Sequence, residues 1–433
     1  MRCKALLNLI FTFLLLFSLV TTTSAKRMKN SKKPIPLSSV HIVDRNGFAE
    51  TITHKDRLNQ FQSLDFLQSQ PYQKVLRIYA RDPSGNIRSI VTSYHPNGNP
   101  KQFLEIMNGR AFGGYREWHE NGVMAVSAKV VGGTADIIPT AERTWLFDGL
   151  SNAWDEDGHI KAEIPYCQGI LEGYSIYYYP NGQVSKRIPY HKGNVDGVME
   201  LYRENGQLLQ QISYVQGTQH GNAVNMWDAT QIASQEDYNN GKLECGTYYD
   251  QQGNMISEVK QGNGYRVVFE NNAISEYQEY RQGNLEGEVK VVGPQGKLKR
   301  LYHIKNDIKH GEEIVYFDKP NAEGNLQPKL AFNWVEGKIQ GPVKTWYSKG
   351  NLESQREMAN NKKNGVSTNW YRDGNIMMIE EYDQDKLVKG EYYKKGEKIP
   401  VSIISQGKGT ATMFDVDGHY IQKIPYVNGK PDE

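Results

Sequence analysis

The hydrophobic and polar residues of this chain follow a pattern that repeats about every 24 residues, and the stretch Gly173–Tyr190 shows it most clearly. Two runs of alternating large and polar residues flank Tyr-Pro-Asn-Gly, which ends at Gly182. Proline suits the early position of a type I turn and glycine accepts a positive φ, so this sequence predicts a hairpin with a type I turn and a glycine bulge. After the turn, Val184, Ile188 and Tyr190 fall on one parity, which predicts one apolar side for the returning strand.

Glycines at the end of this turn define the repeat along most of the chain. Several successive members are 24 residues apart, and degenerate copies near Thr230 and Asn272 restore the spacing where a glycine is missing. The repeat-defining turn glycines are Gly98, Gly122, Gly158, Gly182, Gly206, Gly253, Gly296, Gly324, Gly350, Gly374, Gly396 and Gly418.

Other residue types keep a fixed distance from the turn glycine. A second glycine nine residues earlier marks the start of each hairpin, as at Gly173 and Gly197, and an aliphatic residue follows two positions after the turn. The aromatic column four residues before the turn contains Trp118, Trp154, Tyr178, Tyr202, Tyr249, Trp346, Trp370 and Phe414. The aromatic column eight residues after it contains Tyr166, Tyr190, Tyr214, Tyr238, Tyr280, Phe332, Tyr382 and Tyr426. Columns in register over most of the chain indicate a true structural repeat.

A repeat of two strands and two short turns predicts an all-β fold, an elongated antiparallel meander of stacked hairpins of about 24 residues. At about 4.8 Å between strands, roughly thirteen copies give a ribbon about 125 Å long, a rod and not a globule. One hairpin cannot bury its apolar side alone, so each copy depends on its neighbours and the ends need caps.

The columns resemble those of the MORN repeats (membrane occupation and recognition nexus), in the bacterial variant found in proteins labelled YwqK-family antitoxins. The matching stretches are Gly173–Tyr190, Gly197–Tyr214 and Gly365–Tyr382, and the resemblance covers about residues 79–430. It implies the hairpin-repeat fold, and it implies a scaffold, lipid-binding or antitoxin role. The family pattern contains no catalytic residue to carry over.

The first residues resemble a secretory signal peptide. Arg2 and Lys4 precede an apolar run from Leu6 to Val20, and small residues precede Lys26. We therefore expect residues 1–25 to be removed and the chain to be exported to the periplasm, the envelope or the medium. The alternative is a retained anchor, although a run of this length is short of the about 20 residues that span a membrane.

The segments before the first clear repeat differ in composition. We expect residues 26–40 to form a basic flexible linker and residues 41–78 an N-terminal cap that covers the first sheet edge. Within the cap, Leu58, Phe61 and Leu64 recur at helical spacing after Thr53, which predicts a short helix with a threonine cap. A docking module is the alternative to a cap.

An insertion at about residues 132–145 interrupts the repeat array, which otherwise spans residues 79–433. It carries Ile137, Ile138 and Trp145 outside the columns. Insertions in repeat proteins often lie on the working face, so these three residues are candidate partner contacts. The equal alternative is a loop folded back on the sheet.

Charge and reactive residues limit the function classes. The chain has 51 basic and 49 acidic residues, and removal of Arg2 and Lys4 with the signal segment leaves equal numbers, which argues against a nucleic-acid partner. Cys167 and Cys245 are 78 residues apart, too far along a hairpin ribbon for a disulfide. His95 and His119 occupy equivalent positions about 9.6 Å apart, too far to share one metal ion.

No nucleophile elbow, phosphate loop or metal-ligand motif occurs in the sequence. We therefore expect no catalytic residue, no metal and no cofactor. The aromatic columns are expected to cover a thin sheet, and their alternative role is a binding face.

The sequence favours an exported, non-enzymatic bacterial repeat protein that acts as a protein-binding or structural scaffold. Two alternatives stay open: binding of a membrane surface, lipid or envelope polymer, and an immunity or antitoxin role. The C-terminal copy keeps every column, so self-association through the C-terminal edge strand is a further hypothesis.

Overall fold

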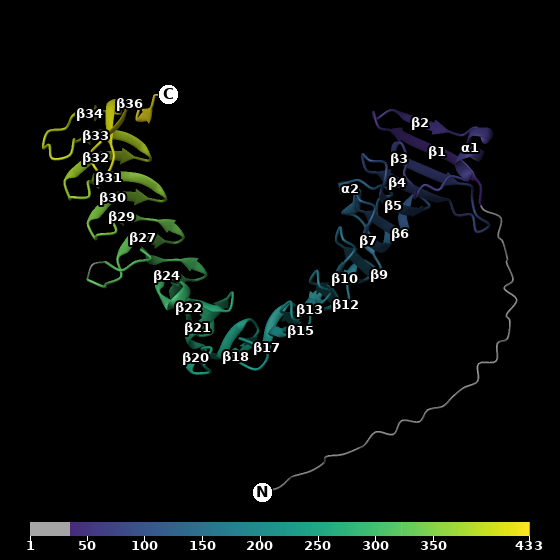
Figure 1. Ribbon diagram of the computed structural model, residues 1–433, viewed down its shortest axis with the longest axis horizontal. Helices are drawn as coiled ribbons and strands as arrows, with labels where there is room; N and C mark the ends of the chain where they lie inside the picture. Colours follow the sequence, from purple (N-terminus) through teal and green to yellow (C-terminus); the bar gives the residue numbers. More distant parts are fainter. Residues whose placement is uncertain (1–34, 322, 433) are drawn as a thin grey trace, which may run out of the picture.

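The computed structural model describes residues 35–321 and 323–432 as one antiparallel β-sheet of 37 strands (Figure 1). Strands that follow one another in the sequence pair in space, and the described residues contain two α-helices and one 3-10 helix. The predicted meander of hairpin repeats with a small N-terminal cap and a short helix is confirmed. The signal segment 1–25 and the basic run Lys26–Lys33 lie outside the described residues.

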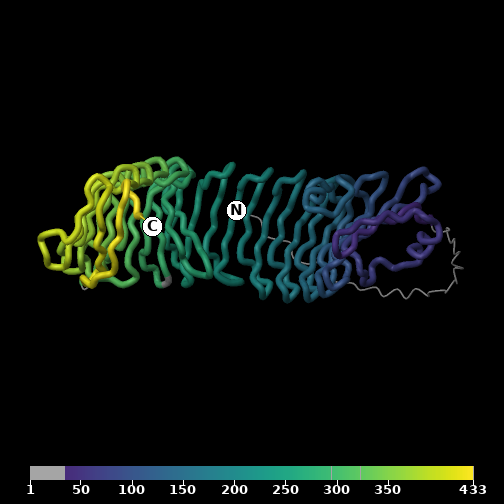
Figure 2. The backbone as a smooth tube through the Cα atoms, turned by 90° about the horizontal axis from the view of Figure 1, so that it is seen from above, coloured from purple at the N-terminus to yellow at the C-terminus, as the bar shows by residue number. Residues whose placement is uncertain are grey.

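The ribbon is elongated as expected, but it is not a straight rod. Figure 1 shows an arch whose two arms meet near β17 (Thr218–Met226) and β20 (Met255–Lys260). Figure 2 shows the strands running across the ribbon one after another along its whole length. Neighbouring strands rotate and coil relative to one another, and this accumulates over so many strands into overall curvature.

The N-terminal part begins with a strand order that differs from a simple meander. β1 lies between β2 and β3, so the short β2 forms the first edge of the sheet. β1 starts inside the segment expected to be a linker. The elements of this part are β1 (Leu37–Asp44), β2 (Ala49–Ile52), α1 (Lys55–Gln62), β3 (Tyr72–Tyr79), β4 (Arg88–Tyr94), β5 (Pro100–Met107), β6 (Arg110–Trp118), β7 (Met124–Gly132), α2 (Pro139–Glu142) and β8 (Leu146–Phe147).

The predicted helix exists but is shorter than expected. His54 and not Thr53 is its N-cap residue, and it ends at Gln62, so Leu64 lies beyond it and is exposed. Arg57 of the helix forms an ion pair with Glu50 of the edge strand β2. Leu58 packs with Val40 and Val75, so the helix covers part of one face of the sheet.

The central repeats define the two faces of the sheet. We call face A the side that carries Ile188 and Tyr190, and face B the side that carries Tyr174 and Arg187; these residues come from adjacent paired strands. The central elements are β9 (Gly149–Trp154), β10 (Ile160–Cys167), β11 (Ile170–Leu171), β12 (Gly173–Tyr178), β13 (Val184–His191), β14 (Asn194–Val195), β15 (Gly197–Tyr202), β16 (Leu208–Val215), β17, β18 (Ile232–Asn239), β19 (Lys242–Tyr249), β20, β21 (Asn263–Glu270), β22 (Ala273–Arg281) and β23 (Asn284–Val292).

The C-terminal arm continues the same pairing. An irregular connection, described at residues 317–321 and 323–327, separates the strand that ends at Tyr316 from the strand that begins at Pro328. Its elements are η1 (Pro294–Gly296), β24 (Leu298–Lys305), β25 (Ile308–Lys309), β26 (Gly311–Tyr316), β27 (Pro328–Val335), β28 (Lys338–Ile339), β29 (Gly341–Trp346), β30 (Leu352–Ala359), β31 (Lys362–Trp370), β32 (Ile376–Asp383), β33 (Lys386–Tyr392), β34 (Ser402–Ser405), β35 (Lys408–Phe414), β36 (Tyr420–Val427) and β37 (Lys430–Pro431).

The first turn of the repeat has the predicted geometry, and its side chains join neighbouring repeats. The amide of Gly182 donates to the carbonyl of Tyr179 over 2.9 Å, and Gly182 has φ 81°. The Tyr179 hydroxyl donates to the carbonyl of Tyr202 over 2.8 Å, and Asn181 Nδ2 donates to the carbonyl of Glu204 over 2.8 Å. Each turn therefore stabilises the next one as well as its own hairpin.

One prediction about this hairpin is wrong. The register shifts by one residue between the pairs Tyr177–Lys186 and Tyr178–Val184, so a β-bulge lies between Lys186 and Val184. The bulge places Val184 opposite Tyr178 on face B, while Ile188 stays on face A. The parity of the sequence does not reveal the extra residue.

The second turn of the repeat has a sequence signal of its own. Lys192 and Gly193 both have positive φ, 49° and 82°, and Gln168 and Gly169 repeat this one period earlier. Positive φ at both central residues defines the type I′ turn, which matches the twist of a two-residue hairpin. A polar residue followed by glycine, thirteen residues before the first-turn glycine, is its signal.

At two places the second turns approach one another closely and form what we call corners. In the first, the amide of Leu243 donates to Gly283, that of Gly283 to Gly262, and that of Gly262 to Glu244, over 2.8–3.0 Å. A Cβ on Gly262 would lie 2.3 Å from the amide nitrogen of Gly283, so only glycine fits there. The second corner repeats these bonds around Leu387, Gly407 and Gly429.

A carboxylate buried in the C-terminal arm makes the stability of that arm depend on pH. Glu313 accepts hydrogen bonds from Lys309 Nζ over 2.9 Å and Trp334 Nε1 over 2.7 Å, and it pairs with Arg300. Burial by itself raises the pKa of Glu313, but these donors outweigh burial and hold its pKa below the ordinary value of 4.5.

We expect the contribution of Glu313 to be complete above about pH 4.5 and to be lost as the pH falls further, because the unfolded chain then binds more protons. Urea unfolding at pH 5 and pH 3 measures this. The Glu313→Gln variant should lose less stability between the two values than the wild type, whereas Glu397→Gln, at an exposed position, should follow the wild type. Equal losses for all three proteins would contradict the expectation.

Candidate functional site

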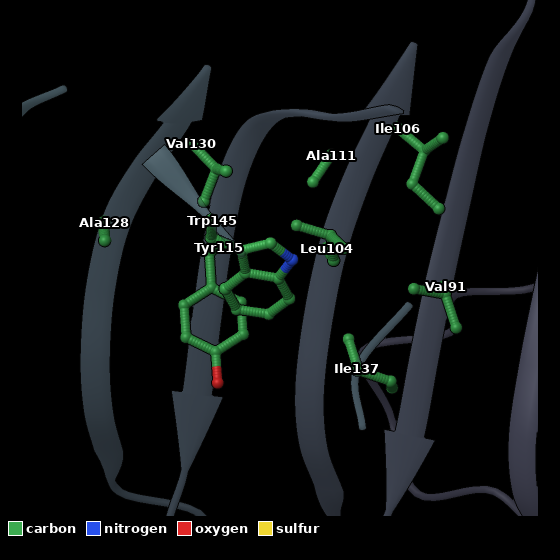
Figure 3. Packing of buried hydrophobic residues seen from close by; sticks show 9 residues of the cluster. All are labelled: Val91, Leu104, Ile106, Ala111, Tyr115, Ala128, Val130, Ile137 and Trp145. Atoms are coloured by element: carbon green, nitrogen blue, oxygen red, sulfur yellow. The ribbon is translucent and has the colours of Figure 1, made fainter. Parts of the chain in front are cut away.

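The insertion does not form the predicted contact surface. Ile137 and Trp145 are each only 7% exposed and pack in a cluster with Leu104 and Tyr115 on face A (Figure 3). The Trp145 ring lies 4.8 Å from that of Tyr115, and its Nε1 donates to the carbonyl of Thr134 over 2.9 Å. The insertion is therefore the loop folded back on the sheet. Of the three predicted contacts, Ile138 alone is exposed.

This fold-back leaves the N-terminal part covered on both faces. Val75 and Leu76 are consecutive strand residues and so point to opposite faces; Val75 packs with Leu58 of α1, and Leu76 packs against the cluster that contains Trp145. The central repeats are different. Among the described residues, none of the four buried clusters, or the residues packed against them, includes a residue between Gly149 and Val198. This stretch is a single layer.

A row of apolar residues lies open on face B of this single layer. Leu150, Tyr174 and Val198 are 52%, 50% and 43% exposed, and they occupy the same position in three successive repeats. Pro165 and Pro189 lie between them, each paired directly with a member of the row. Pro165 is half-buried and Pro189 is buried, so the row spans five strands but is exposed at its three larger side chains, which recur with a pitch of about 9.6 Å.

The second glycine column explains how the prolines fit. A Cβ on Gly173 would lie 3.4 Å from the Pro165 ring, and one on Gly197 would lie 3.2 Å from the Pro189 ring. Both glycines have positive φ, 102° and 113°. Glycine therefore allows the backbone to bend beneath the proline ring of the neighbouring strand. A side chain at this position would lie too close to that ring.

A charged row runs beside the apolar row. Glu163, Arg187 and Glu200 occupy one line across the strands, joined through Ile176. Arg187 Nη1 lies 3.1 Å from Glu200 Oε2, and its guanidinium lies 4.9 Å from the ring centre of Tyr174. The hydrogen bond between Arg187 and the Tyr202 hydroxyl, together with the negative charge of Glu200, raises the pKa of Arg187. This arginine therefore stays charged.

The two predicted aromatic columns lie on opposite faces. Tyr178 and Tyr202 are on face B, where their hydroxyls donate to Glu163 and Glu200. Partial burial, reinforced by the Glu163 carboxylate, raises the pKa of Tyr178 to about 12. Tyr166 and Tyr190 are on face A. Face B therefore combines open apolar residues, oriented tyrosines and one arginine, which are the residue types enriched at protein interfaces.

The two histidines that were considered as metal ligands serve the fold. His95 Nε2 lies 2.8 Å from the carbonyl of Trp118, and His119 Nε2 lies 3.0 Å from that of Trp154, so both histidines link successive turns. Cys167 and Cys245 are free and exposed. Asp155, Asp157 and His159 lie close together, but Asp155 already accepts the amides of the other two within its turn.

In the described part of the chain, no helix has the length and apolar character needed to cross a membrane.

Residues 171–192 and 195–216 match the family model described as the MORN repeat variant. These two adjacent repeats lie within and just beyond the single-layer stretch. The YwqK-type subgroup stays a prediction. No curated protein matches the chain.

Solved structures with some likeness include "Crystal Structure of TcdB2-TccC3-TEV", at 12% identity and a TM-score of 0.12, over 89% of this chain and 24% of that one. A porin-like protein from Bacteroides uniformis matches at 8% identity and a TM-score of 0.13, over 63% of this chain and 95% of that one. The chain thus spans about a quarter of the first of these structures. At such scores neither likeness carries an argument about this protein.

Proposed function

We propose that this protein is a non-enzymatic scaffold that binds a protein partner through face B of strands β9–β15. MORN repeats in general are motifs that bind proteins or membranes. The observation that carries the proposal is the exposed row of Leu150, Tyr174 and Val198 on a stretch that no second layer covers. Isolated apolar residues are common on protein surfaces, whereas several exposed apolar residues aligned in one row and rimmed by polar residues mark an interaction site.

The neighbouring charges support a protein partner more than a lipid partner. Arg187 is 39% exposed and is held in place by Glu200 and Tyr174, so little side-chain entropy is lost on binding. Opposite charges alternate along the row, which would give direction and register to a partner with its own charged groups.

We also propose that the chain is exported, on the support of the signal-like residues 1–25. A partner would then be met outside the cytoplasm. N-terminal sequencing of the protein recovered from cells would begin at Lys26 if this is right and at Met1 if the segment is retained.

Capture from a detergent extract tests the contact face. We expect the immobilised chain to retain a protein that the Tyr174→Lys variant loses, because a charge in the centre of the apolar row must be desolvated on binding. Val366→Lys is the matched control: Val366 occupies the position of Tyr174 in a C-terminal repeat and is also 50% exposed. If Tyr174→Lys captures the same proteins as the wild type, the proposal fails.

A second candidate function is binding of an anionic membrane or envelope polymer, and one observation favours it. Five successive repeats of the C-terminal arm carry an exposed lysine directly after the second turn, and none of the five forms an ion pair in the described part of the chain. They are Lys338, Lys362, Lys386, Lys408 and Lys430. In the same capture format, anionic vesicles would be retained and then lost on replacing all five by glutamine or on raising the salt concentration.

A further inference from the structure

The residues on face B of β9–β15 are arranged nearly symmetrically about β12. The apolar row reads Leu150, Pro165, Tyr174, Pro189, Val198, so that proline flanks Tyr174 on each side and an aliphatic residue stands at each end. A row with this order looks almost the same when it is read from either direction.

The charged row has the complementary order about the same strand. Glu163 lies one strand before β12 and Arg187 one strand after it, on either side of Ile176. Farther out, Asn152 is paired with Glu163, and Glu200 is paired with Arg187. The row is therefore acidic on one side of β12 and basic on the other at the same distance.

We infer that the partner of face B is a second copy of this chain, related by a twofold axis parallel to β12. This inference rests on the proposed function and names its partner. Rotation about such an axis reverses the order of the strands but keeps each row opposite itself. Glu163 then faces Arg187 of the second copy, and Leu150 faces its Val198. Tyr174 lies on the axis and meets itself.

A symmetric pair of contacts of this kind is what an isologous interface requires, because each residue type must find its complement on an identical surface. The repeat pitch supports the same occupant. The exposed residues of successive repeats form ridges about 9.6 Å apart. Such ridges stay in register over three repeats only with a surface of equal spacing, and a second copy of the chain has the same spacing.

The contact area sets the expected affinity. Five strands about 4.8 Å apart and six residues of about 3.4 Å each give a footprint of about 500 Å² per partner, or about 1,000 Å² in total. This is near the lower limit for a specific interface, so we expect a reversible dimer with a dissociation constant on the order of micromolar.

Sedimentation velocity of the full chain from about 1 to 100 µM tests the inference. We expect a monomer–dimer equilibrium, and we expect Tyr174→Lys to raise the dissociation constant at least about 100-fold, because it places two lysines together on the axis. Val366→Lys should leave the equilibrium unchanged. A chain that stays monomeric at 100 µM, or a dimer that tolerates Tyr174→Lys, overturns the inference.

Disulfide cross-linking tests the position of the axis, and its result does not depend on a loss of binding that misfolding could also cause. In a background with Cys3, Cys167 and Cys245 replaced by serine, Tyr174→Cys should form a disulfide-linked dimer on mild oxidation, and Val366→Cys should not. Equal cross-linking by both variants overturns the inference. If the chain is monomeric while Tyr174→Lys still loses a captured protein, the self-pairing is wrong and the proposed function stands.

Discussion

Replacing Arg266 by methionine should destabilise the first corner by about 3–5 kcal/mol, the usual cost of leaving a buried charge without its partner. Glu236 is 3% exposed and accepts from Arg266 Nε over 2.8 Å and from the hydroxyls of Tyr238 and Tyr248. Without the guanidinium, two neutral hydroxyls must hold a buried carboxylate. Because each repeat contacts only its neighbours, the loss should be local, and hydrogen exchange of β18–β21 should report it.

The double variant Arg266→Met/Glu236→Gln separates charge from packing. It removes both charges while keeping a group that the two tyrosines can contact, so it should recover much of the lost stability. The second corner offers an internal comparison, since Glu380 accepts from Tyr382 and Tyr392 at the corresponding place. If Arg266→Met changes exchange no more than an exposed substitution does, the buried pair contributes little.

Truncating Trp145 to alanine should destabilise the N-terminal part by about 3–5 kcal/mol, the range for a large buried aromatic. The ring is 7% exposed, contacts Tyr115 and Phe147, and donates a hydrogen bond to Thr134. Its loss leaves a cavity over β5–β7, and the Thr134 carbonyl keeps only the amide of Asp136 as a donor. Denaturant unfolding measures the effect when it is followed by far-ultraviolet circular dichroism, because this signal reports the sheet and not the removed tryptophan.

Ile138→Ala provides the matched comparison inside the same insertion. Ile138 is 47% exposed, so its truncation should change the free energy of unfolding by no more than about 0.5 kcal/mol. A similar effect for both variants would mean that the insertion does not pack as described. The contrast also shows why deletion of residues 132–145 would be a poor test of partner binding: it would remove part of the core.

The repeat, its period and the first turn could be predicted because each depends on residues close together in the sequence. Proline, asparagine and glycine fix the turn around Asn181 locally, and the same reasoning applies to every copy. The bulge before Val184 could not be predicted, because it depends on how the two strands pair and leaves no mark in composition. One extra residue moves a side chain to the other face, so the sequence places Val184 on the wrong side.

The candidate site was harder to predict for a related reason. Ile137 and Trp145 stand out in the sequence as apolar residues outside the columns, yet they are apolar because they fill a core. Leu150, Tyr174 and Val198 sit inside the repeat pattern and look structural. Only the absence of a covering layer over β9–β15 distinguishes them, and that absence depends on where the insertion and α1 lie in space.

The uncovered stretch also sets how the molecule responds to a load. The N-terminal part up to β8 has cover on both faces, and the arch bends at a corner closed by three backbone hydrogen bonds. In contrast, β9–β15 is held by its ladder, by links between turns and by a few side-chain contacts within the layer. Strands with few buried contacts open first. Tension applied between the two ends of the ribbon would therefore separate these few hairpins first. This stretch would extend while the stiffer parts on either side keep their structure.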